Sequence, residues 1–556
     1  MNAIILLLSC TACFLLAYFV YSRLVAKWLG VDEKRATPAH TCRDGVDYVP
    51  AHPAVLFGHH FASIAGAGPI VGPILAAEFG WAAVVLWVVL GCIFVGAMHD
   101  MVTLFLSVRH RGSSIASVIA QVLGAPGKIL FLLFCWSTLV LVCSEFTRLV
   151  AATFTANPAV ATASLLFIAE AVVFGICTNR FKMPIGLASA VFVPIMFCCV
   201  WVGVRFPLDL QTLFGFNASA AQTVWVVVLL AYCFLASTLP VWLLLQPRDY
   251  LNSYLLYAMM ALGFCGVFFA NPSINIPAFS GWIIHHGESS RCLFPFLFVT
   301  IACGACSGFH ALVASGTTAK QLDNERHIRP VAYGGMLLEG VLAVLSLIAV
   351  ASMSSGDFAA AMKSPNAVAL FASGIAGFCA KMGMNFELAK VFISLSIAAF
   401  LMTSVDTATR LARFTWQELF QKTASDNADV SVAVTGLVGK LFSNMYVATG
   451  LVVALVAVLL IGNPDTAKSL WHIFASSNQL LASLTLLTAS LWLVKEKRNC
   501  AFTLIPMLFM FAASGYAIYS LMRTSSGILQ AACVVLFVMA LALVALVFSQ
   551  RRLWRS

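Results

Sequence analysis

Long apolar segments occupy most of this chain of 556 residues. There are about fifteen of them, each close to the roughly 20 residues that a helix needs to cross the hydrocarbon of a bilayer. Short loops join most of the segments, which leaves no room for a separate aqueous domain. The sequence therefore predicts an all-α polytopic membrane protein. The expected spans are 2–29, 54–77, 81–108, 129–153, 158–177, 184–204, 222–246, 252–270, 293–318, 330–354, 385–410, 441–461, 469–493, 500–521 and 526–549.

The composition excludes a soluble domain, because 61% of the residues are hydrophobic and only 10% are charged. The net charge of +10 is spread over many loops and is not gathered in one patch, so membrane topology explains it and no nucleic-acid partner is expected. The seventeen cysteines show no disulfide-framework spacing. The expected partners are the lipid bilayer and a small-molecule substrate, and the oligomeric state stays open.

The distribution of positive charge predicts the orientation of the chain. An outer N-terminus places roughly 24 of the 32 Lys and Arg residues on the inner side. This topology requires that 365–381 does not cross the membrane, although it is apolar. The first span, 2–29, reads as an anchor and not as a signal peptide, because Arg23 and Lys27 follow its apolar run.

Glycine and proline interrupt two of the spans, 54–77 and 293–318. An unwound helix is tolerated in lipid only where its backbone faces protein, water or a bound solute. We therefore expect free amides and carbonyls at 65–69 and 303–308 to bind solute, with half-helix N-termini favouring a carboxylate. The substrate-binding candidates around the breaks are His59, His60, Ala65, Gly66, Gly68, Cys303, Gly304, Ser307, Gly308 and His310.

The segments that follow the two interrupted spans match element for element. The first series is 54–77, 81–108, 113–123 and 129–153; the second is 293–318, 330–354, 365–381 and 385–410. One series starts inside and the other outside, which indicates an inverted repeat. A solute site is then expected where the two halves meet, near the midplane of the bilayer. This order resembles the leucine-transporter-like five-plus-five superfamily, although two spans within 158–270 are then insertions that the sequence does not single out.

Three motifs carry a further resemblance: Gly58–Pro73, Gln246–Asn252 and Thr403–Arg410. Over roughly 45–420 the chain resembles the carbon-starvation protein A family of bacterial inner-membrane transporters. The resemblance implies import of short peptides or pyruvate during nutrient limitation, with a proton or sodium ion as the coupling ion and no other cofactor. It divides the chain into an N-terminal anchor and inner loop (1–44), a transporter core (45–420) and C-terminal membrane helices (421–556). The N-terminus is then periplasmic and the C-terminus cytoplasmic.

The helix 385–410 carries a candidate ion-coupling site at Thr403, Ser404, Asp406 and Thr407. Hydroxyl and carboxylate oxygens suit a sodium ion, whereas Asp406 alone suits a proton. In the alternative interpretation the hydroxyls bond to their own helix and Asp406 pairs with Arg410 one turn later.

Glu145 and Arg148 lie three residues apart near the end of the span 129–153. Arg148 suits a substrate carboxylate and Glu145 suits an ammonium group, which fits the two ends of a peptide. The alternative is a mutual ion pair that lowers the cost of membrane insertion.

Histidine titrates near neutral pH, so His59, His60 or His310 is a candidate gate or proton relay, against a plain structural role. His99, Asp100, Glu170 and Glu339 are further buried ionisable residues whose partners the sequence does not reveal. Cys303 and Cys306 have the C-x-x-C spacing of metal sites, but inside an apolar span they read as small packing residues. The segment 411–440 is expected to be a polar linker on the inner face.

The chain contains no Walker sequence, phosphate loop or acyl-transfer motif, so we expect no enzyme and take an ion gradient as the energy source. Two alternatives to a symporter remain. One is a membrane redox protein that holds haem or metal through its histidines and Cys303/Cys306. The other is a nutrient sensor without net flux.

Overall fold

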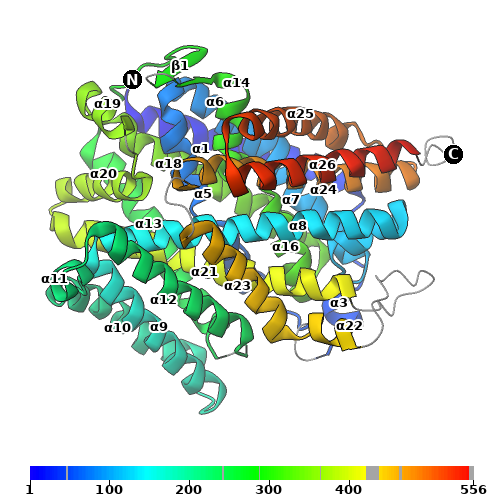
Figure 1. Ribbon diagram of the computed structural model, residues 1–556, viewed down its shortest axis with the longest axis horizontal. Helices are drawn as coiled ribbons and strands as arrows, with labels where there is room; N and C mark the ends of the chain where they lie inside the picture. Colours follow the sequence, from blue (N-terminus) through cyan, green and yellow to red (C-terminus); the bar gives the residue numbers. More distant parts are fainter. Residues whose placement is uncertain are drawn as a thin grey trace.

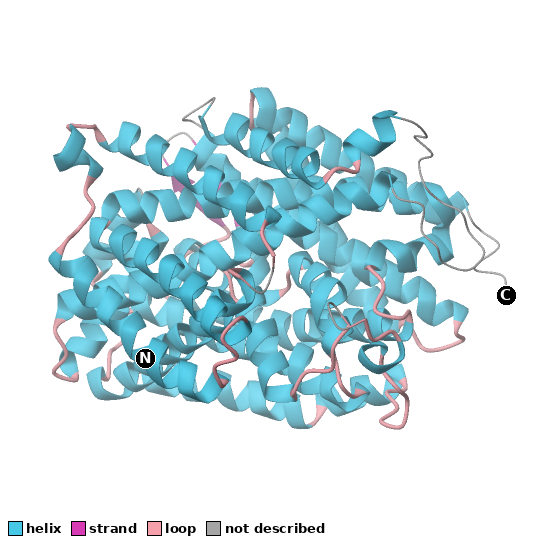
Figure 2. Ribbon diagram, turned by 90° about the horizontal axis from the view of Figure 1, so that it is seen from below, coloured by secondary structure: helices cyan, strands magenta, loops and turns pink. Residues whose placement is uncertain are grey.

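The computed structural model describes residues 1–44, 48–240, 243–286, 289–363, 365–420, 437–461 and 466–549. These residues form helices that run side by side, mostly along the longest axis of the molecule (Figure 1). Figure 2 shows how small the strand content is, one short hairpin among the helices. The expectation of an all-α membrane protein is confirmed.

The elements before the hairpin are α1 (Ala3–Phe19), α2 (Tyr21–Leu29), α3 (Pro38–Thr41), α4 (Pro53–Ile64), α5 (Gly68–Ala76), η1 (Ala77–Phe79), α6 (Trp81–Gly91), η2 (Cys92–Gly96), α7 (Ala97–Arg109), α8 (Ile115–Ala156), α9 (Pro158–Asn179), α10 (Ile185–Arg205), α11 (Leu210–Phe214), α12 (Ala218–Thr238) and α13 (Leu245–Ala270). The hairpin pairs β1 (Ile283–His286) with β2 (Ser289–Cys292) in antiparallel fashion.

The elements after the hairpin are α14 (Leu293–Thr300), α15 (Ala302–Ala305), α16 (Gly308–Val313), η3 (Ala314–Thr318), α17 (Ala319–Gln321), η4 (Glu325–His327), η5 (Arg329–Gly334), α18 (Gly335–Ala351), α19 (Ser355–Lys363), α20 (Ala367–Lys381), α21 (Phe386–Phe420), α22 (Leu437–Phe442), α23 (Met445–Ile461), α24 (Thr466–Lys495), α25 (Ala501–Thr524) and α26 (Gly527–Ser549).

Among the described residues, 12 helices are long and apolar enough to cross a membrane, or up to 13 if the bent α4–α5 pair is one span. About fifteen spans were expected. The difference lies in two places. The expected span 293–318 is divided into the short helices α14, α15, α16 and η3, and the expected span 441–461 is reduced to α23, which has 17 residues.

Both interrupted spans break, over fewer residues than expected. The first break leaves residues 65–67 outside the helices and bends the pair by 45°. Pro69 lies in the first turn of α5, a position that tolerates the missing amide, so α5 already begins at Gly68. In the second break only Cys306 and Ser307 are extended, because Cys303–Ala305 belong to the short helix α15.

The expected pieces 113–123 and 129–153 are joined in the single helix α8, which is kinked at Gly124. Gly124 has a positive φ of 70°, a conformation that glycine adopts without a steric penalty. The segment 365–381 forms α20, whose 15 residues make it shorter than the helices that pass as spans.

Two expected boundaries are wrong. The expected span 222–246 ends in α12 at Thr238, and α13 begins at Leu245, so the Gln246–Asn252 motif is the buried first part of a helix. A proline in the first turn of a helix is tolerated, and it does not break α13. The expected linker 411–440 is also helical at its start, because α21 continues to Phe420; its residues 421–436 lie outside the described part.

The centre of the bundle is built by long helices from both halves of the chain. α8 packs along α21 and α24, while α18 packs along α5. α15 and α16 lie against α24, and α4 lies against α13. Figure 1 shows α9 and α10 at one edge of the bundle and α25 and α26 at another. This arrangement places both helix breaks in the interior.

Candidate functional site

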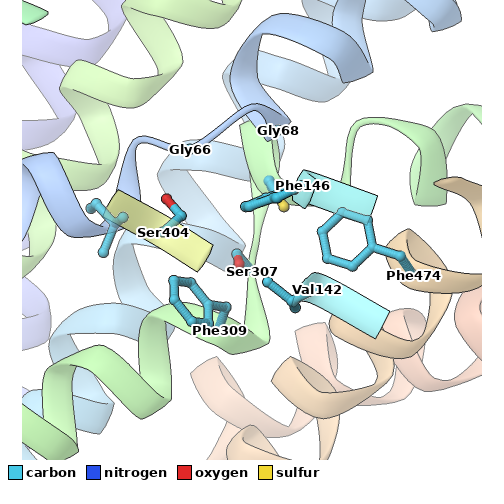
Figure 3. Close-up of a pocket in the computed structure, with 10 residues that line it drawn as sticks. Gly66, Gly68, Val142, Phe146, Ser307, Phe309, Ser404 and Phe474 are labelled. Atoms are coloured by element: carbon cyan, nitrogen blue, oxygen red, sulfur yellow. The ribbon is translucent and has the colours of Figure 1, made fainter. Parts of the chain in front are cut away.

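A pocket lies between the two helix breaks (Figure 3). It has an empty volume of about 260 Å³ that includes its opening. The residues that line it come from α4, both breaks, α8, α15, α16, α21 and α24; they are Ile64, Gly66, Gly68, Val142, Phe146, Cys303, Ser307, Phe309, Ser404 and Phe474. None of these ten residues is charged, so the pocket is an apolar enclosure with a few polar groups.

The polar groups of the pocket are two hydroxyls and unwound backbone. Figure 3 shows the Ser404 and Ser307 side chains below the Gly66–Gly68 segment, with the phenylalanine rings around them. The buried Ser404 Oγ has no hydrogen-bond partner among the described residues. A buried hydroxyl without a partner costs free energy, so Ser404 is poised to bond a solute in the pocket.

Asn478 on α24 holds the second break in place. Its Oδ1 accepts a hydrogen bond of 2.8 Å from the backbone N of Phe309. Its Nδ2 donates to Ser307 Oγ at 3.0 Å and to Cys303 Sγ at 3.2 Å. The sequence analysis missed this residue, although the polar run Ser476–Gln479 inside an apolar span was a signal for it. The transporter core expected over 45–420 therefore lacks a helix, α24, that contributes to this pocket.

The two broken helices approach each other closely at glycine. A Cβ atom on Gly68 would lie 1.8 Å from Cys303 Cβ, and one on Gly72 would lie 2.7 Å from the Thr300 carbonyl oxygen. A Cβ on Gly66 would lie 3.1 Å from Ser404 Oγ. Only glycine allows α5 and α15 to come this close.

The structure brings five of the predicted site residues to the pocket: Gly66, Gly68, Cys303, Ser307 and Ser404. The other residues predicted near the breaks lie outside its lining; they are His59, His60, Ala65, Gly304, Gly308 and His310.

Asp406 forms a buried ion pair with Arg248 of α13. The Arg248 Nη1 and Asp406 Oδ2 atoms are 2.5 Å apart, and both side chains are at most 1% exposed. Tyr232 of α12 donates its hydroxyl to the same Asp406 oxygen at 2.8 Å. Asp406 was expected to bind a coupling ion or Arg410, and Arg248 was not considered because the motif that contains it was placed at a span boundary.

The other hydroxyls of the predicted ion-coupling site differ in their contacts. Thr403 Oγ1 donates to the Ala399 carbonyl at 3.1 Å, the self-bonding of the alternative interpretation, and accepts from Asn252 Nδ2 at 2.5 Å. Ser404 faces the pocket, and Thr407 is not part of its lining. The four residues therefore do not converge on one position.

Glu145 and Arg148 bind each other, with distances of 3.0 Å and 2.5 Å between guanidinium nitrogens and carboxylate oxygens. Neither residue lines the pocket, although their neighbours Val142 and Phe146 do. This geometry matches the mutual pair described as the alternative above.

The three predicted histidines, His59, His60 and His310, lie near the helix breaks but do not line the pocket. His60 Nδ1 is 2.9 Å from Thr318 Oγ1, and His59 Nδ1 is 3.8 Å from Asp249 Oδ2. His310 Nδ1 is 2.8 Å from Asp100 Oδ2. Each of the three therefore faces a polar side chain on another helix.

A multi-pass bundle with a small apolar pocket between two broken helices is typical of membrane transport proteins. The fold is similar to that of a solved structure: a crystal structure of the Eremococcus coleocola manganese transporter, in complex with an aromatic bis-isothiourea substituted compound, matches with a TM-score of 0.50 at 10% identity, covering 92% of this chain and 99% of that chain. At this identity the likeness shows the fold alone.

The chain belongs to the carbon starvation protein CstA family, whose model matches residues 2–370 and 360–517. It is 32% identical to the peptide transporter CstA of Bacillus subtilis (strain 168), over 94% of this chain and 91% of the relative. It is 29% identical to the pyruvate/proton symporter BtsT of Escherichia coli (strain K12), over 93% of this chain and 81% of the relative.

Proposed function

We propose that this chain is a secondary active transporter of the bacterial inner membrane that imports pyruvate together with protons. The observation that carries the proposal is the pocket between the two helix breaks. Broken helices at mid-depth are the usual location of solute sites in secondary transporters. The relative named as a pyruvate/proton symporter supports the same solute and ion.

The chemistry of the pocket favours a small carboxylate. Gly68, the first residue of α5, lines the pocket, and the N-terminus of a helix favours a negative group. The Ser404 and Ser307 hydroxyls suit the acid or keto oxygens, and Val142 and the phenylalanine rings suit the methyl group. Short peptides are the second candidate class, because the Bacillus relative is named a peptide transporter.

The contacts of Asp406 favour the proton over sodium as the coupling ion. A guanidinium already occupies the Asp406 carboxylate, and arginine stays charged at any physiological pH. A sodium ion about 4 Å from that charge meets a repulsion of about 4 kcal/mol at an effective dielectric constant near 20. The predicted sodium site therefore holds a fixed cation of the protein itself.

The helix contacts support an inverted repeat. α12 packs on α8, α21 and α23, and α23 packs on α21, α8 and α12, as two equivalent helices of inverted halves would. Likewise α13 packs on α4 and α21, while α24 packs on α16 and α8. If α12 corresponds to α23 and α13 corresponds to α24, the two inserted spans are the peripheral helices α9 and α10.

The test is uptake of labelled pyruvate and of a labelled dipeptide into proteoliposomes, under an imposed proton gradient and, separately, an imposed sodium gradient. We expect pyruvate to accumulate with the proton gradient only. Accumulation driven by sodium alone would contradict the ion, and accumulation of the dipeptide without pyruvate would contradict the solute.

A pocket variant links this flux to the site. Gly66→Val places atoms against Ser404 and Phe146, so we expect it to lower uptake at least tenfold while the protein stays folded. The matched control is Gly186→Val on α10, where a Cβ meets nothing within 4 Å. Equal uptake by both variants would place the solute elsewhere.

A further inference from the structure

Four ionisable side chains gather beside the second break, away from the pocket lining: His99 and Asp100 of α7, His310 of α16 and Glu339 of α18. We call them the carboxyl–imidazole cluster. Each is at most 1% exposed. The cluster therefore joins one half of a broken helix to two unbroken helices through buried groups.

The imidazole of His310 lies between two carboxyl groups. His310 Nδ1 is 2.8 Å from Asp100 Oδ2, and His310 Nε2 is 3.4 Å from Glu339 Oε2. His99 Nδ1 is 2.8 Å from the other Asp100 oxygen. The Asp100 carboxyl thus has close partners on both oxygens.

Glu339 contacts His310 but makes no hydrogen bond in the described part of the chain. Neither of its oxygens has a hydrogen bond among the described residues, and both are fully buried. An ionised carboxylate in such a place is costly, and one imidazolium balances only one of the two carboxylates. The cluster is therefore one proton short of neutrality when Asp100 and Glu339 are both ionised, His310 is protonated and His99 is neutral.

We propose that Glu339 is the proton-binding residue of the transport cycle and that the Asp100–His310 pair positions it. The inference rests on the proposed function, since a coupling proton has meaning only for a symporter. A proton from water binds one carboxylate oxygen of Glu339 and leaves from it on the other side of the membrane. His310 stays between the two carboxyl groups in both states.

A route to Glu339 follows one face of α18. A Cβ on Gly335 would lie 3.5 Å from His60 Cδ2, so the His60 ring rests on that residue. Glu339 lies four residues further, on the same face of the helix. His59, next to His60, is 25% exposed in its side chain. The histidines of α4 thus place one partly exposed imidazole, and a second one against α18, on the side of the cluster.

The cluster is also connected to the pocket. His310 follows Phe309, which lines the pocket, and both belong to α16. Cys303, another lining residue, is close enough to Glu339 for an electrostatic interaction. A change of charge at Glu339 therefore acts on the helices that enclose the solute.

The remaining titratable groups that face the cluster are neutral thiols and one imidazole. They are His60 of α4, Cys92 of η2, Cys303 of α15 and Cys306 of the break, with Cys10 of α1 behind Cys92. The described part of the chain places no lysine or arginine among them, so His310 is the basic side chain paired with Glu339.

The experiment compares the wild type with Glu339→Gln in two assays of the same proteoliposomes. We expect Glu339→Gln to lose proton-driven pyruvate accumulation, by at least tenfold, and to retain exchange of internal for external pyruvate without a gradient. The matched control is Glu170→Gln, which alters another buried membrane carboxyl, on α9, and should keep both activities. Undiminished proton-driven accumulation in Glu339→Gln would overturn the inference.

A second measurement does not depend on transport. In an infrared pH titration of the protein in lipid, the wild type should show a carbonyl band of a protonated buried carboxyl that is missing from Glu339→Gln, while bands of the other buried carboxyls appear in both. Glu339→Asp should retain a band at a shifted pH, which covers the case in which the glutamine variant does not fold. If the wild type moves no pyruvate, the proposed function fails, but the infrared titration still decides the proton site: identical carbonyl bands in the wild type and in Glu339→Gln refute it.

Discussion

The ion pair between Arg248 and Asp406 shows how one residue contact changes the interpretation of a motif. The pair joins α13 to α21, and Tyr232 of α12 donates a hydrogen bond to the same Asp406 oxygen. Burying two charges is expensive, and it is tolerated only when each is matched and hydrogen-bonded. Because arginine does not lose its proton in proteins, the positive charge of Arg248 stays beside Asp406, and the pair joins three helices.

We predict that Arg248→Gln destabilises the protein by about 3–5 kcal/mol, the typical cost of leaving one buried charge without its partner. Asp406→Asn should cost a similar amount for the same reason. Thermal unfolding of the purified protein in detergent measures both effects. Loss of uptake in Asp406→Asn alone then reports a structural defect and does not identify a coupling residue.

The double variant Arg248→Gln/Asp406→Asn is the control for this prediction. Removing both charges should recover much of the lost stability, because no unpaired charge stays buried. If the stability losses of the two single variants simply added in the double variant, the two charges would not be coupled. The ion pair would then not contribute to stability.

At the scale of elements, the close contact of the two broken helices determines the pocket. α5 and α15 pack with backbone against backbone, and glycines at the crossing make this possible. The polar backbone of both breaks then faces one small volume between them. A side chain at the crossing would push the helices apart and open the pocket.

We predict that Gly68→Ala lowers pyruvate uptake at least tenfold, because its Cβ would lie 1.8 Å from Cys303 Cβ and 2.7 Å from Cys303 Sγ. Removal of those atoms in Gly68→Ala/Cys303→Gly should restore part of the uptake. Gly377→Ala on α20, where a Cβ meets nothing within 4 Å, is the neutral control. A Gly68→Ala variant with normal uptake would mean that the crossing is flexible enough to adjust.

The helix breaks could be predicted from the sequence because glycine and proline act locally. Gly66, Gly68 and Pro69 interrupt a helix whatever its neighbours are. The sequence therefore predicts both breaks at nearly the right positions. The partners of Asp406 and of the second break could not be predicted in the same way. Arg248 lies 158 residues from Asp406, and Asn478 lies 171 residues from Ser307, so only the packing of the whole bundle brings each pair together.

At the scale of the whole molecule, the loops meet in two groups that agree with the expected topology. Asn2 pairs with Ser273 in one group, where both segments are expected outside. In the other group Ala36 pairs with Asn324, and Arg498 donates to the Trp28 carbonyl at 3.4 Å; all of these segments are expected inside. The contacts therefore support the expected grouping of the loops on two sides of the membrane, and which side is the outside stays a prediction.

Two native cysteines make this topology testable. Cys292 is exposed at the end of β2, in the loop expected outside, and Cys42 is partly exposed after α3, in the loop expected inside. In variants that retain one of the two and replace the other cysteines with alanine or serine, a membrane-impermeant maleimide on intact cells should label Cys292 and leave Cys42 unmodified. Permeabilised cells should show both labelled, which controls for accessibility. Labelling of Cys42 alone in intact cells would mean that the orientation is opposite to the expected one, with the positive loops outside. The direction in which a proton on Glu339 drives the solute would then also be reversed.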